Sequence, residues 1–142
     1  MFQMDWKKNC HLVKLPKVLV NTNTLGIGGY MKSVICNDKT QCYLCGCNKV
    51  AHEHHIFNGP DRHMAEEYGL KVYLCFECHE GDDGVHGRTD KAEYLRKGLR
   101  KSGQLVFERL YEQKKYKTKE PEWFYDRSPR EKFMQLFRMN YL

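Results

Sequence analysis

Hydrophobic and polar residues follow two different periods in the middle of the chain. Residues 50–57 read as a β-strand that carries three histidines, and residues 70–74 form a second β-prone run. Between them, residues 61–68 suit a short helix, and Gly69 stands where glycine commonly ends a helix. The pattern therefore predicts a strand, a helix and a second strand in this order.

Helical spacing dominates the part of the chain after residue 88. Thr89 or Asp90 can cap a helix there. The apolar residues that follow at helical spacing include Ala92, Leu95, Leu99, Val106 and Leu110. Gly98 and Gly103 lower the helix propensity, so one long helix and two shorter helices are equally compatible with the pattern.

The two ends of the sequence predict one helix and one hairpin. Residues 128–131, Ser-Pro-Arg-Glu, form a capping box with proline at the first helical position. Three apolar residues follow at helical spacing and are expected to pack onto the core: Phe133, Leu136 and Phe137. At the other end, residues 17–20 and 30–36 flank a glycine-rich turn, which predicts a loose β-hairpin.

Composition limits how this fold can be stabilised. Of the 142 residues, 41% are hydrophobic, and the mean hydropathy is −0.74, so we expect a modest core that needs a staple. The sequence opens without a signal segment and has no apolar run near the roughly 20 residues of a membrane span. We therefore expect an intracellular, reducing location, where cysteines bind metal rather than form disulfides.

The net charge of +6 is unevenly distributed along the chain. Residues 51–87, which hold most of the histidines, carry a net charge of −6, whereas residues 1–50 and 88–120 carry +5 and +6. A site that concentrates a divalent cation between surfaces that attract phosphate would have this distribution. An unevenly charged, solvated surface is the alternative.

Two Cys-x-x-Cys pairs carry the strongest chemical signal. Cys42 and Cys45 stand on a predicted tight turn, and Cys75 and Cys78 follow the second predicted strand. Two thiolates at this spacing can face one tetrahedral ion, so the four together indicate a structural zinc. Cys47 can replace Cys45 as a ligand, although the spacing favours Cys45. Two redox-active or buried thiol pairs are the alternative interpretation.

The histidines between and after these cysteines complete a family pattern. The sequence reads Cys-x-x-Cys, then His54-His55-Ile, then Leu-Cys-x-x-Cys-His79, and finally His86. This order resembles the HNH, or ββα-metal (His-Me finger), nuclease superfamily in its zinc-stapled form. It is most similar to the small HNH proteins of bacteriophages, including the RecA-dependent nuclease type. The resemblance covers about a third of the chain, and residues 131–142 resemble the C-terminal segment of some of those proteins.

The resemblance implies a role for each of these histidines. It implies that His54 binds a catalytic ion and that His55 is the general base. Adjacent strand residues point to opposite faces, which agrees with this division. His79, with His86 or with an acid from Asp82 and Asp83, would complete the ligand set. The acidic surroundings favour a hard ion such as Mg²⁺ or Mn²⁺.

The sequence departs from the family pattern in two places. The asparagine that usually precedes the second strand and holds the base histidine is absent, because residues 67–70 read Glu-Tyr-Gly-Leu. Asn58 or Asp61 can supply an equivalent side chain. His79 and His86 are further apart than in the common His-x-x-x-His spacing, and glycines between them predict a bent loop. A site that has lost its activity is therefore an alternative.

Basic and aromatic residues are interleaved after residue 95. The predicted nucleic-acid contacts are Arg96, Lys97, Arg100, Lys101, Lys114 and Lys115, with Tyr111 and Tyr116 among them. Such side chains can contact phosphates and stack on unpaired bases. A solubilising helix face followed by a basic linker is the alternative.

Together these features predict an α+β fold with a ββα-metal core at residues 41–88, stapled by a four-cysteine zinc site. Residues 1–40 are an N-terminal extension, and residues 89–142 a basic helical extension. The predicted function is metal-dependent endonucleolytic cleavage of DNA, by a phage-encoded protein in the bacterial cytoplasm, with a recombination or replication protein as an expected partner. The alternatives are a catalytically inactive, zinc-bound module that binds nucleic acid or protein, and a redox protein.

Overall fold

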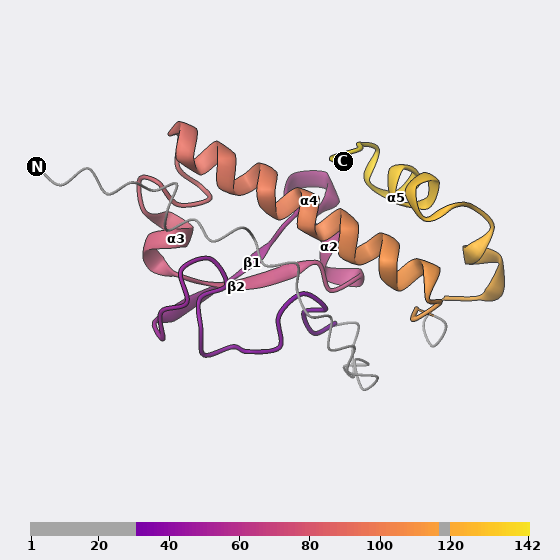
Figure 1. Cartoon of the computed structure of the whole chain (residues 1–142), viewed down its shortest axis with the longest axis horizontal. Helices are drawn as coiled ribbons and strands as arrows, with labels where there is room; N and C mark the ends of the chain where they lie inside the picture. Colours follow the sequence, from indigo (N-terminus) through magenta and orange to yellow (C-terminus); the bar gives the residue numbers. More distant parts are fainter. Residues whose placement is uncertain (1–30, 117–119) are drawn as a thin grey trace, which may run out of the picture.

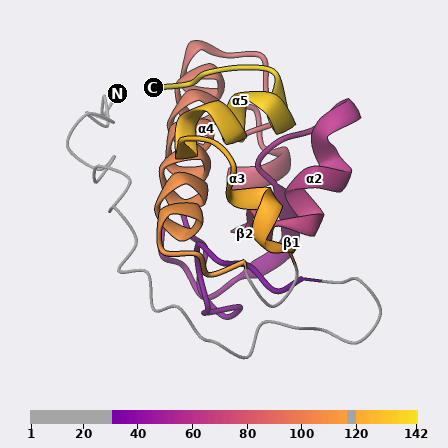
Figure 2. The same cartoon turned by 90° about the vertical axis from the view of Figure 1, so that its right-hand side faces the viewer.

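The computed structural model describes residues 31–116 and 120–142, which form a mixed α+β fold. The elements in chain order are β1 (Val50–His55), η1 (Gly59–Asp61), α2 (Arg62–Glu67), β2 (Lys71–Cys75), α3 (Phe76–Glu80), α4 (Asp90–Glu112), η2 (Glu122–Tyr125) and α5 (Pro129–Phe137). The long helix α4 runs beside the β-hairpin, and α5 lies next to α4 (Figure 1). Seen from the end, α4 and α2 flank the hairpin on different sides (Figure 2).

The central strand–helix–strand prediction is confirmed. β1 pairs antiparallel with β2, and this register places His54 opposite Val72 and His55 opposite Lys71. Between the strands, α2 ends before Gly69, which takes a left-handed φ of 68°. Every residue of β2 is buried, so this strand is covered on both faces.

The two glycines of α4 do not divide it. The Thr89 side chain accepts a hydrogen bond from the Ala92 N–H, and the helix then continues without interruption to Glu112. A Cβ on Gly103 would lie 3.0 Å from the Phe57 ring, so the glycine lets α4 approach the residues after β1 closely. Within the described residues, no helix has the length and apolar character that crossing a membrane requires.

The predicted start of the last helix is confirmed. The Ser128 side chain accepts from the Glu131 N–H, and the Glu131 carboxylate accepts from the Ser128 N–H, which completes the capping box of α5. Phe133 and Phe137 are fully buried, and Phe137 lies 4.6 Å from the Phe57 ring, measured between ring centroids. The C-terminal helix therefore packs on the residues that follow β1.

The predicted N-terminal hairpin is not supported where it can be followed. Residues 17–20 lie outside the described residues, and residues 32–36 are irregular instead of extended. The reason is local: the Ser33 hydroxyl accepts hydrogen bonds from the N–H groups of Ile35 and Cys36, which bends the backbone into a turn. The Val34 N–H still donates to the Gly69 carbonyl and docks this segment beside β2.

We expect Gly69→Ala to lower the free energy of unfolding by roughly 1–3 kcal/mol more than Gly59→Ala. Both glycines have φ above 60°, but a Cβ on Gly69 would lie 2.5 Å from the Lys32 carbonyl oxygen, whereas Gly59 faces open space. Urea denaturation of the metal-loaded variants measures the difference. Equal losses would show that the segment of residues 32–34 does not press on Gly69 in solution.

Candidate metal centre

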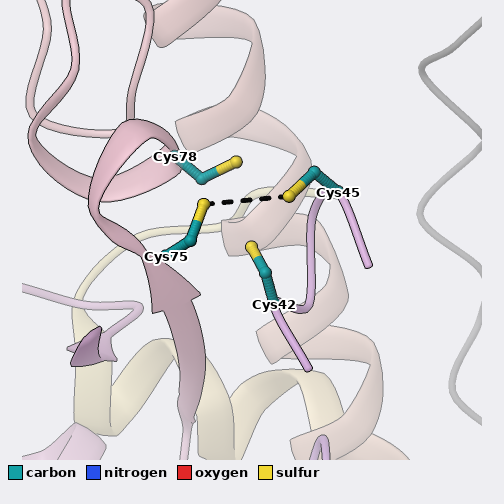
Figure 3. A group of neighbouring side chains, drawn as sticks. All are labelled: Cys42, Cys45, Cys75 and Cys78. Atoms are coloured by element: carbon teal, nitrogen blue, oxygen red, sulfur yellow. Dashed lines mark hydrogen bonds between the residues drawn. The ribbon is translucent and has the colours of Figure 1, made fainter. Parts of the chain in front are cut away.

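Four cysteine side chains converge between the 42–47 turn and the start of α3 (Figure 3). The sulfur atoms of Cys42, Cys45, Cys75 and Cys78 all lie within 4.8 Å of one another, and the Cys45 and Cys75 sulfurs are 3.7 Å apart. A tetrahedral zinc with bonds of about 2.3 Å to sulfur requires its ligands to be about 3.8 Å apart. The four residues therefore can hold an ion such as zinc.

The backbone brings both pairs to one point. The Gly46 N–H donates to the Cys42 carbonyl, and the left-handed φ of 75° at Gly46 closes the turn that carries Cys45. On the other side, Cys75 ends β2 in an extended conformation and α3 begins at the next residue, which sets Cys78 one helical turn along. The Tyr43 N–H donates to the Tyr73 carbonyl and ties the turn to β2.

The electrostatics of the cluster favour a cation. The hydrogen bond from Cys78 lowers the pKa of Cys42 to about 4, although burial opposes this shift. Burial raises the pKa of Cys45 to about 12, and the same contact with Cys42 raises the pKa of Cys78. Cys42 is therefore the member of this trio whose thiolate form is favoured, and a divalent ion bound among the sulfurs would favour the thiolate form of its ligands.

In the described part of the chain, two further cysteines lie outside this group. Cys47 is on the same turn but does not belong to the four sulfurs, and Cys36 has its sulfur 3.8 Å from the Ser33 hydroxyl. Burial raises the pKa of the Cys36 thiol. The arrangement agrees with the preference for Cys45 over Cys47 as a ligand.

Cys75→Ser is expected to abolish stoichiometric zinc binding, and Cys47→Ser is expected to retain it, because only the first removes a sulfur from the tetrahedral set. Elemental analysis of both purified variants measures zinc per chain, and circular dichroism shows whether the chain folds. Loss of zinc in Cys47→Ser would exchange the roles of Cys45 and Cys47. Full zinc in Cys75→Ser would contradict the four-cysteine site.

Three of the predicted histidines meet in a second group. His54 comes from β1, His79 from α3 and His86 from the loop before α4, and each offers a ring nitrogen within 4.8 Å of the others. The Nε2 atoms of His79 and His86 are 3.1 Å apart. His54 is buried, and burial with the neighbouring imidazoles of His79 and His86 lowers its pKa to about 3. Its ring is therefore neutral and has a lone pair for a metal ion.

His79 and His86 are seven residues apart in the sequence, and the loop between them folds back so that their side chains meet. The N–H groups of Val85 and His86 donate to the carbonyls of Cys78 and His79. Nη1 of Arg96, on α4, donates to the carbonyls of Val85 and Gly87 at 2.9 and 2.7 Å. His86 is thus held between two anchored carbonyls.

The ligand atoms of this group differ from the expected hard-ion site. Asp82 and Asp83 lie outside the group, and Asp83 instead accepts a hydrogen bond from the Thr89 hydroxyl. Three imidazoles suit transition ions such as zinc or nickel better than magnesium. The residues therefore fit a divalent transition ion. The group contains no carboxylate oxygen of the kind that magnesium prefers.

Two residues near this group were not identified from the sequence. The His52 ring stacks on His79 with centroids 4.6 Å apart, and the Glu80 carboxylate lies 2.9 Å from Nδ1 of His79. His52, His79 and Glu80 form an overlapping group of ligand atoms. His52 stands two residues before His54 on the same strand, and strand residues at this spacing point to the same face. The spacing could therefore have indicated that His52 lies beside the histidine group.

His55 belongs to a different cluster. Its Nε2 lies 2.6 Å from Oε2 of Glu66 on α2, and Lys71 donates to both oxygens of the same carboxylate. Burial raises the pKa of Glu66, but the hydrogen bonds from Lys71 and His55 outweigh it and the net shift is downward. No sequence pattern indicated Glu66, because its distance from His55 depends on how α2 packs against β1.

The predicted nucleic-acid contacts occupy two separate places. Lys97 pairs with Glu93, Arg100 lies over the Tyr141 ring, and Lys101 is exposed, all on the N-terminal half of α4. Lys114 and Lys115 follow its end, about 20 Å further along the helix axis. Lys114 pairs with Glu122. Among the described residues, no carboxylate pairs with Arg100, which also lies near enough to His54 to act on its charge.

Comparisons with protein-family models, with curated proteins and with solved structures found no match to this chain. The family resemblance therefore stays a prediction, and the geometry of the two clusters is the basis on which a function can be proposed.

Arg96→Ala is expected to weaken Ni²⁺ binding at the histidine group by about tenfold or more, because the loop that carries His86 loses two hydrogen bonds. Titration calorimetry of the zinc-loaded protein with Ni²⁺ measures the affinity. Lys97→Ala, on the same helix but paired with Glu93, is the matched control and should bind as the unchanged protein does. Equal affinities in the two variants would exclude a role of Arg96 in holding His86.

Proposed function

We propose that this protein is a metal-dependent endonuclease of the HNH type that hydrolyses phosphodiester bonds in DNA. The observation that carries the proposal is the meeting of His54, His79 and His86 beside a four-cysteine cluster, with His55 as the next residue on the same strand. The order of these residues agrees with the family resemblance, and the residues between them fold so that the ligand atoms meet.

The group of His54, His79 and His86 and the ring of His55 would have separate roles in the reaction. A divalent ion bound by the three imidazoles would stabilise negative charge on the phosphate and on the leaving oxygen. His55 accepts the proton of the attacking water and is separated from the ion ligands by the alternation of the strand. Arg100, near His54 and without a carboxylate partner in the described residues, attracts the phosphate.

The cysteine cluster has a structural task in this proposal. Its four sulfurs leave no open position for a substrate when they surround a tetrahedral ion. Zinc at this place would join the turn of Cys42 to the start of α3, and it would hold His79, the residue that follows Cys78, toward β1. Zinc and the catalytic ion therefore have separate ligands.

A plasmid cleavage assay with the zinc-loaded protein tests the proposal. Relaxation or linearisation of supercoiled DNA is expected with Mn²⁺, Co²⁺ or Ni²⁺, and a lower rate with Mg²⁺, because the ligands are imidazoles. His55→Ala should reduce the rate about 10²–10⁴-fold, the usual contribution of a general base. His63→Ala removes an exposed histidine of α2 and is the matched control. Cleavage that His55→Ala leaves unchanged would contradict the assigned base.

One observation favours the alternative of a zinc-bound binding module. His55 has one ring nitrogen committed to Glu66, and its cluster is distinct from that of His54. Such a module would retain DNA binding, seen as retardation on a gel, while the plasmid stays supercoiled with each of the four ions. The redox alternative requires thiols that remain titratable in the zinc-loaded protein at Cys42, Cys45, Cys75 and Cys78.

A further inference from the structure

A buried lysine fixes the carboxylate that meets His55. Lys71 is fully buried, and its Nζ lies 2.9 and 3.1 Å from the two oxygens of Glu66 and 3.2 Å from Glu53. An ammonium group in this position needs anionic partners, because transfer from water without them is costly. The Lys71 amine therefore holds both oxygens of the Glu66 carboxylate. The further contact of this carboxylate is the one that Oε2 makes with the ring of His55.

The second contact determines which nitrogen of His55 carries the proton. Nε2 of His55 lies 2.6 Å from Oε2 of Glu66. An ionised carboxylate only accepts hydrogen bonds, so Nε2 must be the donor. In a neutral imidazole the other nitrogen then has the lone pair. Nδ1 is therefore the basic atom of the ring.

In the family that the sequence resembles, an asparagine usually holds the base histidine. That asparagine is absent from residues 67–70 here, so another residue would have to hold the ring of His55. Asp61, one of the candidates for its replacement, pairs with Arg138 at 2.9 Å. Glu66 is the residue whose side chain reaches the ring of His55. It comes from α2, one residue before the segment where the asparagine is expected.

We propose that Glu66 is the positioning residue of His55, and that the buried Lys71 amine anchors it. Together they select the Nε2–H form of the imidazole and turn Nδ1 toward the water that the ring would activate. The catalytic meaning of this arrangement rests on the proposed nuclease function, whereas the arrangement itself concerns the ring of His55 alone. Lys71 takes the place that a cation would need among Glu53, His55 and Glu66.

The direct test is nitrogen-15 NMR of the histidine rings in the zinc-loaded full chain. His55, assigned by its loss in His55→Ala, is expected to show a protonated Nε2, an unprotonated Nδ1 and a slowly exchanging Nε2 proton. In Glu66→Gln this proton should shift upfield and exchange faster, because an amide accepts a weaker hydrogen bond than a carboxylate. Glu67→Gln changes the neighbouring acid and should leave the His55 signals unchanged. A ring protonated at Nδ1 in the unchanged protein overturns the proposal.

Cleavage kinetics give a second measurement. Glu66→Gln should lower kcat for plasmid nicking about 10–100-fold with KM within about twofold, because the ring and not the DNA loses its partner. Unchanged kcat overturns the catalytic part of the proposal. A protein without nuclease activity that still shows the Glu66-dependent Nε2 proton contradicts the proposed function and retains the positioning. Cleavage that needs His55 but not Glu66 supports the proposed function and contradicts the catalytic role of Glu66.

An effect of Glu66→Gln on folding has to be distinguished from the loss of the hydrogen bond to His55. Glu66→Gln removes one anionic partner from the Lys71 amine, so the double variant Glu66→Gln, Lys71→Met removes both members of the buried pair. Zinc content and circular dichroism confirm that each variant is folded. The double variant should show the same loss of the slowly exchanging His55 proton as Glu66→Gln alone. A proton that persists in both variants overturns the proposal.

Discussion

The position of the histidine group depends on the convergence of four sulfurs from two places in the chain. The turn of Cys42 and the junction of β2 with α3 meet there (Figure 3), and in the sequence His79 directly follows Cys78. Whatever fixes Cys78 therefore also fixes His79 opposite His54. The helix α3 has only five residues, and His79 is the one of them that is buried, so we expect its own packing to contribute little to fixing that distance. A metal ion held by the four sulfurs would fix this position in place of packing, and the proposed function needs His79 to be placed accurately.

The alternation of side chains along β1 places adjacent histidines in opposite environments. His54 is surrounded by other imidazoles and kept neutral, whereas His55 faces a carboxylate and a buried amine. In the proposed function, one face of this strand would bind the metal ion and the other would carry the ring that accepts the proton. A one-residue change in the pairing of β1 with β2 would exchange the two rings, so the register of the hairpin is part of the site.

Much of this arrangement could be predicted from the sequence, because it depends on local periods and spacings. The two strands, the helix between them, the capping box of α5 and the cysteine cluster were all predicted. The missing parts depend on contacts between distant segments. Glu66 and Arg96 acquire their partners only when α2 and α4 are packed, and Gly103 supports close packing where helix propensity left one long helix and two shorter ones equally possible. Ser33 bent a segment whose residues favour a strand.

The double hydrogen bond of Arg96 has a thermodynamic consequence for the long helix. It joins α4, which carries four of the six predicted nucleic-acid contacts, to the loop that carries His86. Any ligand that binds α4 more tightly when the histidine group holds an ion must raise the affinity for that ion by the same factor. Substrate and ion would then retain each other, and the free protein would release its ion more readily than the complex does. In this way a guanidinium that never touches the metal would couple the two occupancies.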